Sequence, residues 1–317
     1  RDYYASRGLG DVYKRQGYHY RQSFNKYSDP YSLDNLSSSL ELAYVNLKAR
    51  HNLNFTIGKQ FVNFGGYEYY VNSIRVREFS EFNNLLTAYQ AGISGNWQVN
   101  PDHELCFQIV NNRNGNDEDI YPTGLPEGTA KAKIPFMYTV NWNSYYLDKS
   151  LQLRYATAVG QQTRKRYSYY FTCGNTYEKG PLLTYLDVMY TRQGIDQHGV
   201  VSRLPGTPHT AMNTEYLSII GDVDYRVHPQ WNVYVKGAYE TARVYKGNGD
   251  FRKGMYRRSW NAQSSVEFFP FKQLDLFVFV LYTYRGVILE KAATRMGAIE
   301  PDTHRISLGL VYSIPVF

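Results

Sequence analysis

The end of the chain carries a long alternation of apolar and polar side chains. From Thr303 to Phe317 one face of the expected strand is mostly apolar, and the other carries Arg305, Ser307, Gly309 and Ser313. The apolar face holds Ile306, Leu308, Leu310, Tyr312 and Ile314. Side chains of a strand point alternately to opposite faces, so the pattern predicts a two-sided strand. Soluble domains rarely end on such a strand, because an unpaired sheet edge invites aggregation.

The same alternation recurs along the chain in segments of about ten residues, which predicts about fourteen strands. The strands are expected near 18–27, 36–48, 52–63, 84–95, 103–112, 134–147, 149–161, 166–176, 182–194, 217–226, 231–240, 260–268, 274–284 and 303–317. Short turns and long connections alternate between these segments. No apolar stripe with helical spacing and useful length competes with this interpretation.

Composition separates a membrane protein built of strands from one built of helices. The mean hydropathy is −0.51, and the sequence holds no apolar run long enough for a transmembrane helix. The 32 Tyr and 16 Phe residues suit aromatic girdles at membrane interfaces and a pore lining. We therefore predict an all-β, transmembrane, antiparallel up-and-down β-barrel of the bacterial outer membrane. The alternative is a tyrosine-rich soluble β-sandwich such as a sugar-binding module.

The start of the chain does not follow the strand pattern. Residues 1–16 lack the apolar core and cleavage site of a signal peptide and are similar to translated adapter sequence, so we expect them to be non-native. Residues 17–317 are then expected to form an N-terminally truncated barrel domain. With one hairpin restored, the intact protein would have sixteen strands, enough to enclose a water-filled channel.

Two stretches carry a family resemblance. The segment Ile57-Gly-Lys-Gln-Phe-Val-Asn-Phe-Gly-Gly-Tyr-Glu68, continued to Gly92, and the segment Leu105-Cys-Phe-Gln-Ile-Val-Asn-Asn-Arg-Asn-Gly115 resemble regions of the phosphate-selective porin O/P family. The related OmpL-like porin-2 group shares the Gly-Tyr-Glu turn and stays open. The resemblance implies a sixteen-stranded homotrimeric porin whose third outer loop folds into the lumen and forms the constriction.

In this sequence the loop that the resemblance assigns to the constriction is 64–83. Its charged residues are Glu68, Arg75, Arg77, Glu78 and Glu81. The two arginines are two positions apart, so in an extended segment they share a face. We therefore expect them to form an anion-attracting step. The other interpretation is a solvated loop in which these arginines pair with Glu78 and Glu81.

The phase of the strands predicts which charged side chains face the lumen. The expected lumen residues are Arg154, Arg226, Lys236, Arg257, Arg285 and Arg305, with Asp187, Asp222, Asp224, Glu240, Glu267 and Asp275. Carboxylates match the basic residues in number, which departs from a phosphate-selective ladder of arginines and lysines. Rows of opposite charge that face each other across the lumen, and produce a transverse electric field as in general-diffusion porins, therefore fit equally well. Inward aromatics such as Tyr234, Phe277 and Phe279 leave a sugar-conducting pore open.

The resulting hypothesis is an outer-membrane porin that passes small hydrophilic solutes passively, including anions such as phosphate. The sequence shows no catalytic motif, so we expect no enzyme, no cofactor and no metal site. Expected partners are outer-membrane lipid, the solutes and lipopolysaccharide near Arg164-Lys-Arg166, but not nucleic acid. A non-conducting structural or adhesive barrel and a barrel enzyme are the alternatives of another class.

Overall fold

The computed structural model describes residues 16–20, 40–71, 76–112, 121, 123–204, 209–271, 274 and 276–312. They form one antiparallel sheet of 14 strands in which every strand pairs with its neighbours in sequence. The first seven are β1 (Gln16–Tyr20), β2 (Leu40–Arg50), β3 (Leu53–Phe61), β4 (Tyr89–Asn100), β5 (His103–Asn111), β6 (Phe136–Tyr146) and β7 (Leu151–Thr163). The others are β8 (Arg166–Lys179), β9 (Leu182–Ile195), β10 (Met212–His228), β11 (Trp231–Val244), β12 (Gly254–Phe268), β13 (Leu276–Leu289) and β14 (Thr303–Tyr312).

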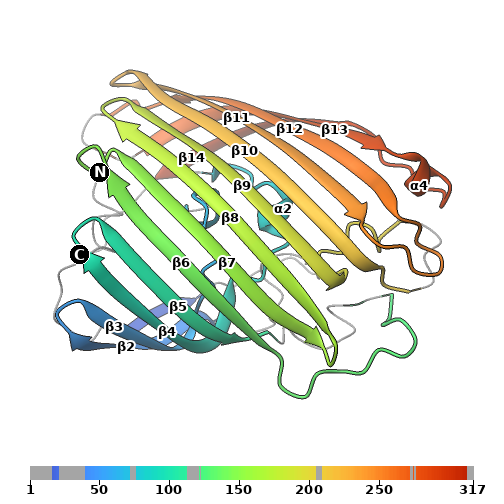
Figure 1. Cartoon of the computed structure of the whole chain (residues 1–317). Coiled ribbons are helices and arrows are strands. Elements are labelled where there is room, and N and C mark those ends of the chain that lie inside the picture. The colour runs from blue at the N-terminus through green and yellow to red at the C-terminus, as the bar shows by residue number, and fades with distance from the viewer. Residues whose placement is uncertain are drawn as a thin grey trace.

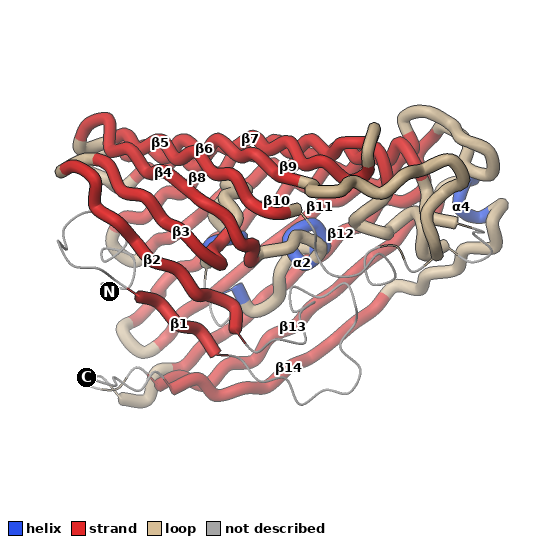
Figure 2. The backbone as a smooth tube through the Cα atoms, turned by 90° about the horizontal axis from the view of Figure 1, so that it is seen from below, coloured by secondary structure: helices blue, strands red, loops and turns tan. Residues whose placement is uncertain are grey.

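The strands run diagonally across the view of Figure 1, and the sheet curls around an interior. Figure 2 shows the curl bringing β1 back to the side of the molecule where β13 and β14 lie. The connections at one end are short, as between β2 and β3, β4 and β5, or β10 and β11. The connections at the other end include the long ones, which lead into β4, β6, β10 and β14. The predicted all-β, up-and-down architecture is confirmed, with short turns at one end.

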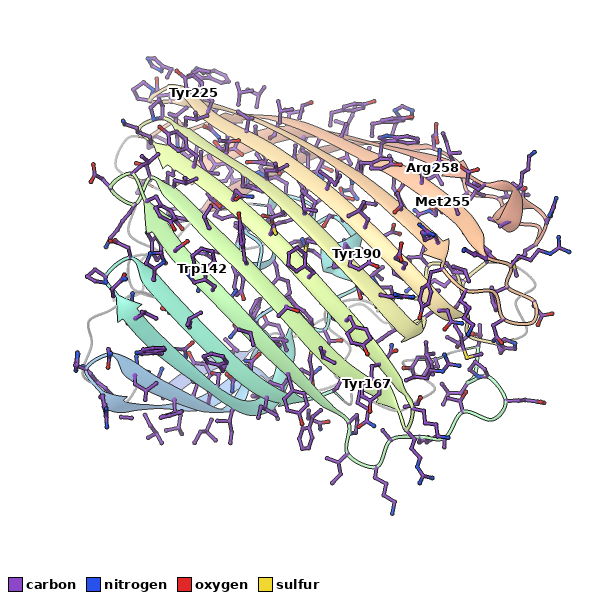
Figure 3. All side chains as sticks on the ribbon, in the orientation of Figure 1. Trp142, Tyr167, Tyr190, Tyr225, Met255 and Arg258 are labelled. Atoms are coloured by element: carbon purple, nitrogen blue, oxygen red, sulfur yellow. The ribbon has the colours of Figure 1, made fainter. Side chains whose placement is uncertain are left out.

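The two faces of the sheet differ as the alternation predicts. Apolar side chains are exposed on the outward face of nearly every described strand: Val45, Phe55, Ile93, Phe107, Tyr138, Val159, Phe171, Leu186, Ile219, Val235, Val266, Val280 and Leu308. On this face Tyr225 lies near the end with the short turns, and Tyr167 lies near the opposite end (Figure 3). The inner face buries polar side chains such as Thr139, Ser218 and Gln263. This is the division of a membrane barrel, apolar toward lipid and polar toward the lumen.

Several predicted strands were wrong in their bounds, and those expected near 217–226 and 260–268 begin earlier, at Met212 and Gly254. The segment 84–95 was expected to be extended, but β4 begins at Tyr89 and continues to Asn100. The four residues before Leu85 form a short helix, α2 (Glu81–Asn84), in which the Ser80 hydroxyl accepts a hydrogen bond from the Asn83 N–H. The alternation could not mark this boundary, because an apolar loop residue and an apolar strand residue look alike in the sequence.

Two other short helices accompany α2 in the described parts of the connections. η2 (Glu68–Tyr70) belongs, like α2, to the chain between β3 and β4, and Figure 2 shows α2 within the curl of the sheet. α4 (Lys291–Thr294) lies between β13 and β14. No helix among the described residues is long and apolar enough to cross a membrane. Residues 1–15 and 313–317, with the terminal Phe317, lie outside the described residues.

The largest cluster of buried apolar side chains lies inside the curled sheet. It joins residues of the connection between β3 and β4, among them Phe64, Tyr69 and Phe82, to inward side chains such as Met189 and Ile220. Burial of apolar surface at about 25 cal/mol per Å² is the main force that holds such a segment in place. The connection between β3 and β4 therefore packs into the interior of the barrel together with residues of other connections, such as Val201 and Phe251.

Candidate functional site

The chain after β3 turns sharply into the interior at two glycines. Gly65 and Gly66 both have φ of +79°, a conformation that side chains with a Cβ rarely adopt. The Gly66 N–H donates a hydrogen bond of 3.1 Å to the carbonyl oxygen of Arg154 on β7. A Cβ at Gly174 on β8 would lie 2.6 Å from the Cα of Gly66. Glycine on both sides thus lets the loop backbone lie directly on the wall.

A carboxylate of β9 holds the next two residues of the loop. Oδ2 of Asp187 accepts hydrogen bonds of 2.8 Å from the backbone N–H groups of both Tyr67 and Glu68. Asp187 is fully buried, and this double contact supplies part of the hydrogen bonding that a buried carboxylate requires. The start of η2 is therefore fixed to the wall through Asp187.

Glu68 then ties the two arms of the loop together and to β11. Its side chain is completely buried and forms an ion pair with the ammonium group of Lys236. The Ser80 N–H donates to Oε1 of Glu68 over 3.0 Å, and the Asn83 amide donates to Oε2. Lys236 also donates to the carbonyl oxygen of Glu78 over 2.7 Å. One buried ion pair thus links the arm of the loop that leaves β3 (the descending arm), the arm that leads into β4 (the returning arm) and the wall.

Arg77 of the loop is buried against the inner wall. Its carboxylate partner is Glu267 on β12, and their side chains are only 5% and 3% exposed. The guanidinium carbon lies 5.3–5.8 Å from the ring centroids of three aromatic residues: Tyr234, Phe277 and Phe279. The Tyr234 hydroxyl donates to the Val76 carbonyl over 3.0 Å. Cations over aromatic faces gain stabilisation, most when they are desolvated.

The returning arm is anchored through α2. Glu240 on β11 accepts hydrogen bonds from the Glu81 N–H (3.2 Å), the Phe82 N–H (2.9 Å) and the Ser218 hydroxyl (3.0 Å). The first N–H groups of a helix have no partner within the helix, so a carboxylate is well placed there. Loop 64–83 is thus bonded to inward side chains of β9, β11 and β12.

A second set of charges joins the loop to the last strands. Arg257 on β12 and Arg285 on β13 both bond to Glu81 of the loop and to Glu300 of the connection before β14. Arg305 on β14 pairs with Glu78. Glu300 was not among the residues predicted from the sequence, because a long connection has no periodicity that reveals where a side chain points. Its partners Arg257 and Arg285, by contrast, lie on strands, and the alternation of the strands predicted that they face the lumen.

The remaining predicted lumen residues are distributed along the wall. Arg154 lies 5.3 Å from the ring centroid of Tyr70 in the loop, whereas Arg226 lies over Phe269 at 3.8 Å, in the turn after β12. Asp224 accepts a hydrogen bond from Asn232, and the buried Asp222 stands opposite Lys236 in the register of β10 and β11. Arg75 and Asp275 lie outside the described residues.

Three details of the sequence hypothesis need correction. Arg77 cannot offer a free charge to passing anions, since it is buried against Glu267. It was expected to pair, if at all, with its neighbours Glu78 and Glu81, but these bind the arginines of the wall. Opposite charges of the loop and wall are in direct contact, so these pairs do not form facing rows across an open lumen.

The connection between β9 and β10 also packs against the loop. His198, between β9 and β10, is buried, packs its ring against Tyr216 with centroids 5.0 Å apart, and meets the edge of Phe82 at 5.0 Å. Burial lowers the pKa of His198 to about 3, with a further contribution from Arg203. Beside it is a cavity of about 20 Å³, room for about one water molecule.

Within the described part of the chain, no three His, Cys, Asp or Glu side chains form a group that could hold a metal ion.

The family model and the solved structures that match this chain are porins or outer-membrane channels. A family model described as phosphate-selective porin O and P matches residues 8–314. OmpF of Salmonella typhi, in complex with daunomycin, is 15% identical with a TM-score of 0.58, covering 88% of this chain and 79% of its own. The outer-membrane channel DcaP of Acinetobacter baumannii is 12% identical with a TM-score of 0.55, covering 87% and 75%. An anion-selective porin from Comamonas acidovorans is 10% identical with a TM-score of 0.51, covering 84% and 76%. No curated protein sequence matches.

Proposed function

The chain belongs to the phosphate-selective porin O and P family of outer-membrane diffusion channels, and from this premise we propose that loop 64–83 forms the constriction of its pore. The observation that carries the proposal is the attachment of both arms of this loop to the inner wall, through Asp187, Lys236 and Glu240. A segment fixed in this way narrows the space that a solute must cross. Rings of charged side chains at a narrow point then filter solutes by size and charge.

For the solute, we propose small hydrophilic molecules, with small inorganic anions such as phosphate among them. The family description supports the anion, and the arginines of β12, β13 and β14 could attract it. Because carboxylates pair with these arginines, the preference for anions is expected to be weak, close to that of a general-diffusion channel. The sugar-conducting alternative loses support, since Tyr234, Phe277 and Phe279 surround Arg77.

The surroundings of the barrel belong to the same proposal. The exposed apolar face of the strands is suited to outer-membrane lipid. Arg164 and Lys165 form the exposed turn between β7 and β8, where the phosphate groups of lipopolysaccharide are expected to bind. We retain the homotrimer and the non-native origin of residues 1–16 as proposals.

Single-channel recording in a planar lipid bilayer tests the proposed function. We expect the purified chain to produce discrete, long-lived current steps. Liposome swelling with sugars of increasing size should then give a sharp upper limit of permeation. A correctly folded chain that inserts but gives neither current nor swelling would contradict the porin, and would favour a structural, adhesive or enzymatic barrel.

A further inference from the structure

Four side chains form a closed ring of ion pairs between the loop and the wall. Nη1 of Arg257 bonds to Glu81, and Nε of the same residue lies 2.8 Å from Oε2 of Glu300. Nη2 of Arg285 lies 3.1 Å from Oε1 of Glu81 and 3.0 Å from Oε1 of Glu300. Each arginine therefore contacts both carboxylates, and each carboxylate contacts both arginines. The ring carries two positive and two negative charges.

The ring is partly open to solvent on the side of Arg285. The Arg257 side chain is only 5% exposed, but those of Arg285, Glu300 and Glu81 are 35%, 32% and 26% exposed. Both arginines are on the inner face of their strands, and α2, which carries Glu81, lies within the curl of the sheet (Figure 2). The exposed part of the ring thus borders the interior of the barrel, where ions pass.

We propose that Glu300 sets the ion selectivity of the channel by cancelling the positive charge that Arg285 presents to the pore. This inference rests on the proposed function and names a specificity-determining residue in the connection before β14. An arginine is always charged, so the sign of the local field depends on how many carboxylates stand beside it. With both glutamates in place the ring is neutral, and without Glu300 it carries one net positive charge.

Glu300 is better suited than Glu81 to this role and to its test. Glu81 is part of α2, whose first N–H groups are held by Glu240, so a change at Glu81 would also disturb the loop. Glu300 reaches the ring from another connection and takes no part in holding loop 64–83. A glutamine at position 300 retains an oxygen that accepts a hydrogen bond from an arginine, so it removes the charge and keeps the contact.

The same connection offers a matched control. Glu290 is also a glutamate paired with an arginine, with a similar exposed fraction of 29%, and its Oε1 lies 3.1 Å from Nη2 of Arg258. Arg258 is on the outward face of β12 (Figure 3), as the alternation with the buried Arg257 and Ser259 shows. Glu290→Gln therefore makes the same chemical change on the side of the wall away from the pore.

The experiment compares reversal potentials in a KCl gradient across a planar bilayer for the parent chain, Glu300→Gln and Glu290→Gln. For charges about 5 Å apart in water, we expect Glu300→Gln to favour chloride about fourfold and to disfavour potassium, so the chloride-to-potassium permeability ratio should rise at least about fourfold. Salt near 0.1 M keeps the screening length at about 10 Å, so the change stays measurable. Glu290→Gln should leave the ratio unchanged, and Arg285→Gln should lower it.

Each outcome decides the inference. A raised ratio in Glu300→Gln together with a lowered ratio in Arg285→Gln supports it. Equal ratios in the parent, Glu300→Gln and Glu290→Gln would overturn it while leaving the porin intact, as would an equal rise in both glutamate variants. A parent chain that inserts without conducting would instead overturn the proposed function, and the inference with it. Far-UV circular dichroism confirms that the compared variants are folded alike.

Discussion

Arg77 and Glu267 form an ion pair that is almost completely excluded from solvent, although 190 positions separate them in the sequence. The pair fastens loop 64–83 to β12, beside three aromatic rings. Arg77 itself has φ of +65°, a conformation that is uncommon for residues other than glycine. The loop backbone is therefore bent at this residue in a way that places its side chain against Glu267.

Glu267→Gln should release this attachment. Removing one partner of a buried ion pair leaves the other charge uncompensated, so we expect the free energy of unfolding to fall by about 3 kcal/mol. Urea unfolding in detergent micelles, followed by tryptophan fluorescence, measures this loss. The control is Glu178→Gln at the exposed end of β8, which should change the value by less than about 0.5 kcal/mol. Equal stability of the two variants would show that the pair does not hold the loop.

Two strand glycines provide a matched test of the contact between loop and wall. A Cβ at Gly174 would lie 2.6 Å from the Cα of Gly66 and 2.8 Å from Oδ1 of Asp187, whereas a Cβ at Gly237 would meet nothing within 4 Å. Gly174→Ala should therefore lower the free energy of unfolding by about 1–3 kcal/mol. Gly237→Ala should leave it nearly unchanged. The urea midpoints of the two variants measure the difference, and a Gly174→Ala midpoint equal to the parent's would argue against close packing.

The free energy of unfolding should depend on pH through His198, in the connection between β9 and β10. Its pKa is lowered from 6.5 to about 3 in the folded chain by burial, so the unfolded chain takes up a proton first as the pH falls. The free energy of unfolding should thus decline as the pH falls from about 6.5 toward 3. His198→Gln, which cannot take up this proton, should show a smaller decline. Urea titrations at several pH values test this, and parallel pH profiles of the two chains would exclude His198 as a cause.

The fold was accessible from the sequence because a membrane barrel has two chemically different faces. The alternation located the strands and the inward phase of residues such as Lys236, Arg257 and Arg285. It failed between Asn84 and Tyr89, where the loop returns to the wall. The turn at Gly65 and Gly66 lies in the segment that carries the family resemblance, and it uses the conformational freedom of glycine.

The pairing within the site was less accessible. Phase tells which way a side chain points, but not which distant segment lies against it, so the burial of Arg77 by Glu267 and three rings had no signal in the sequence. Glu300 and His198 are in long connections without periodicity, where only the three-dimensional contacts reveal their partners. Asp187 was assigned to the lumen, yet its role in holding the loop backbone depends on hydrogen bonds that no pattern indicates.

The measurement that most directly tests the central claim asks whether loop 64–83 borders the path of the ions. Asn84, at the exposed end of α2, is changed to cysteine, and a charged thiol reagent is added to open channels in a bilayer. The parent chain is the control, since of its free cysteines Cys106 is buried and Cys173 is on the outward face of β8. We predict a stepwise fall of the Asn84→Cys current and a constant parent current. An unchanged Asn84→Cys current after complete labelling, verified by mass spectrometry, would contradict a constriction formed by this loop.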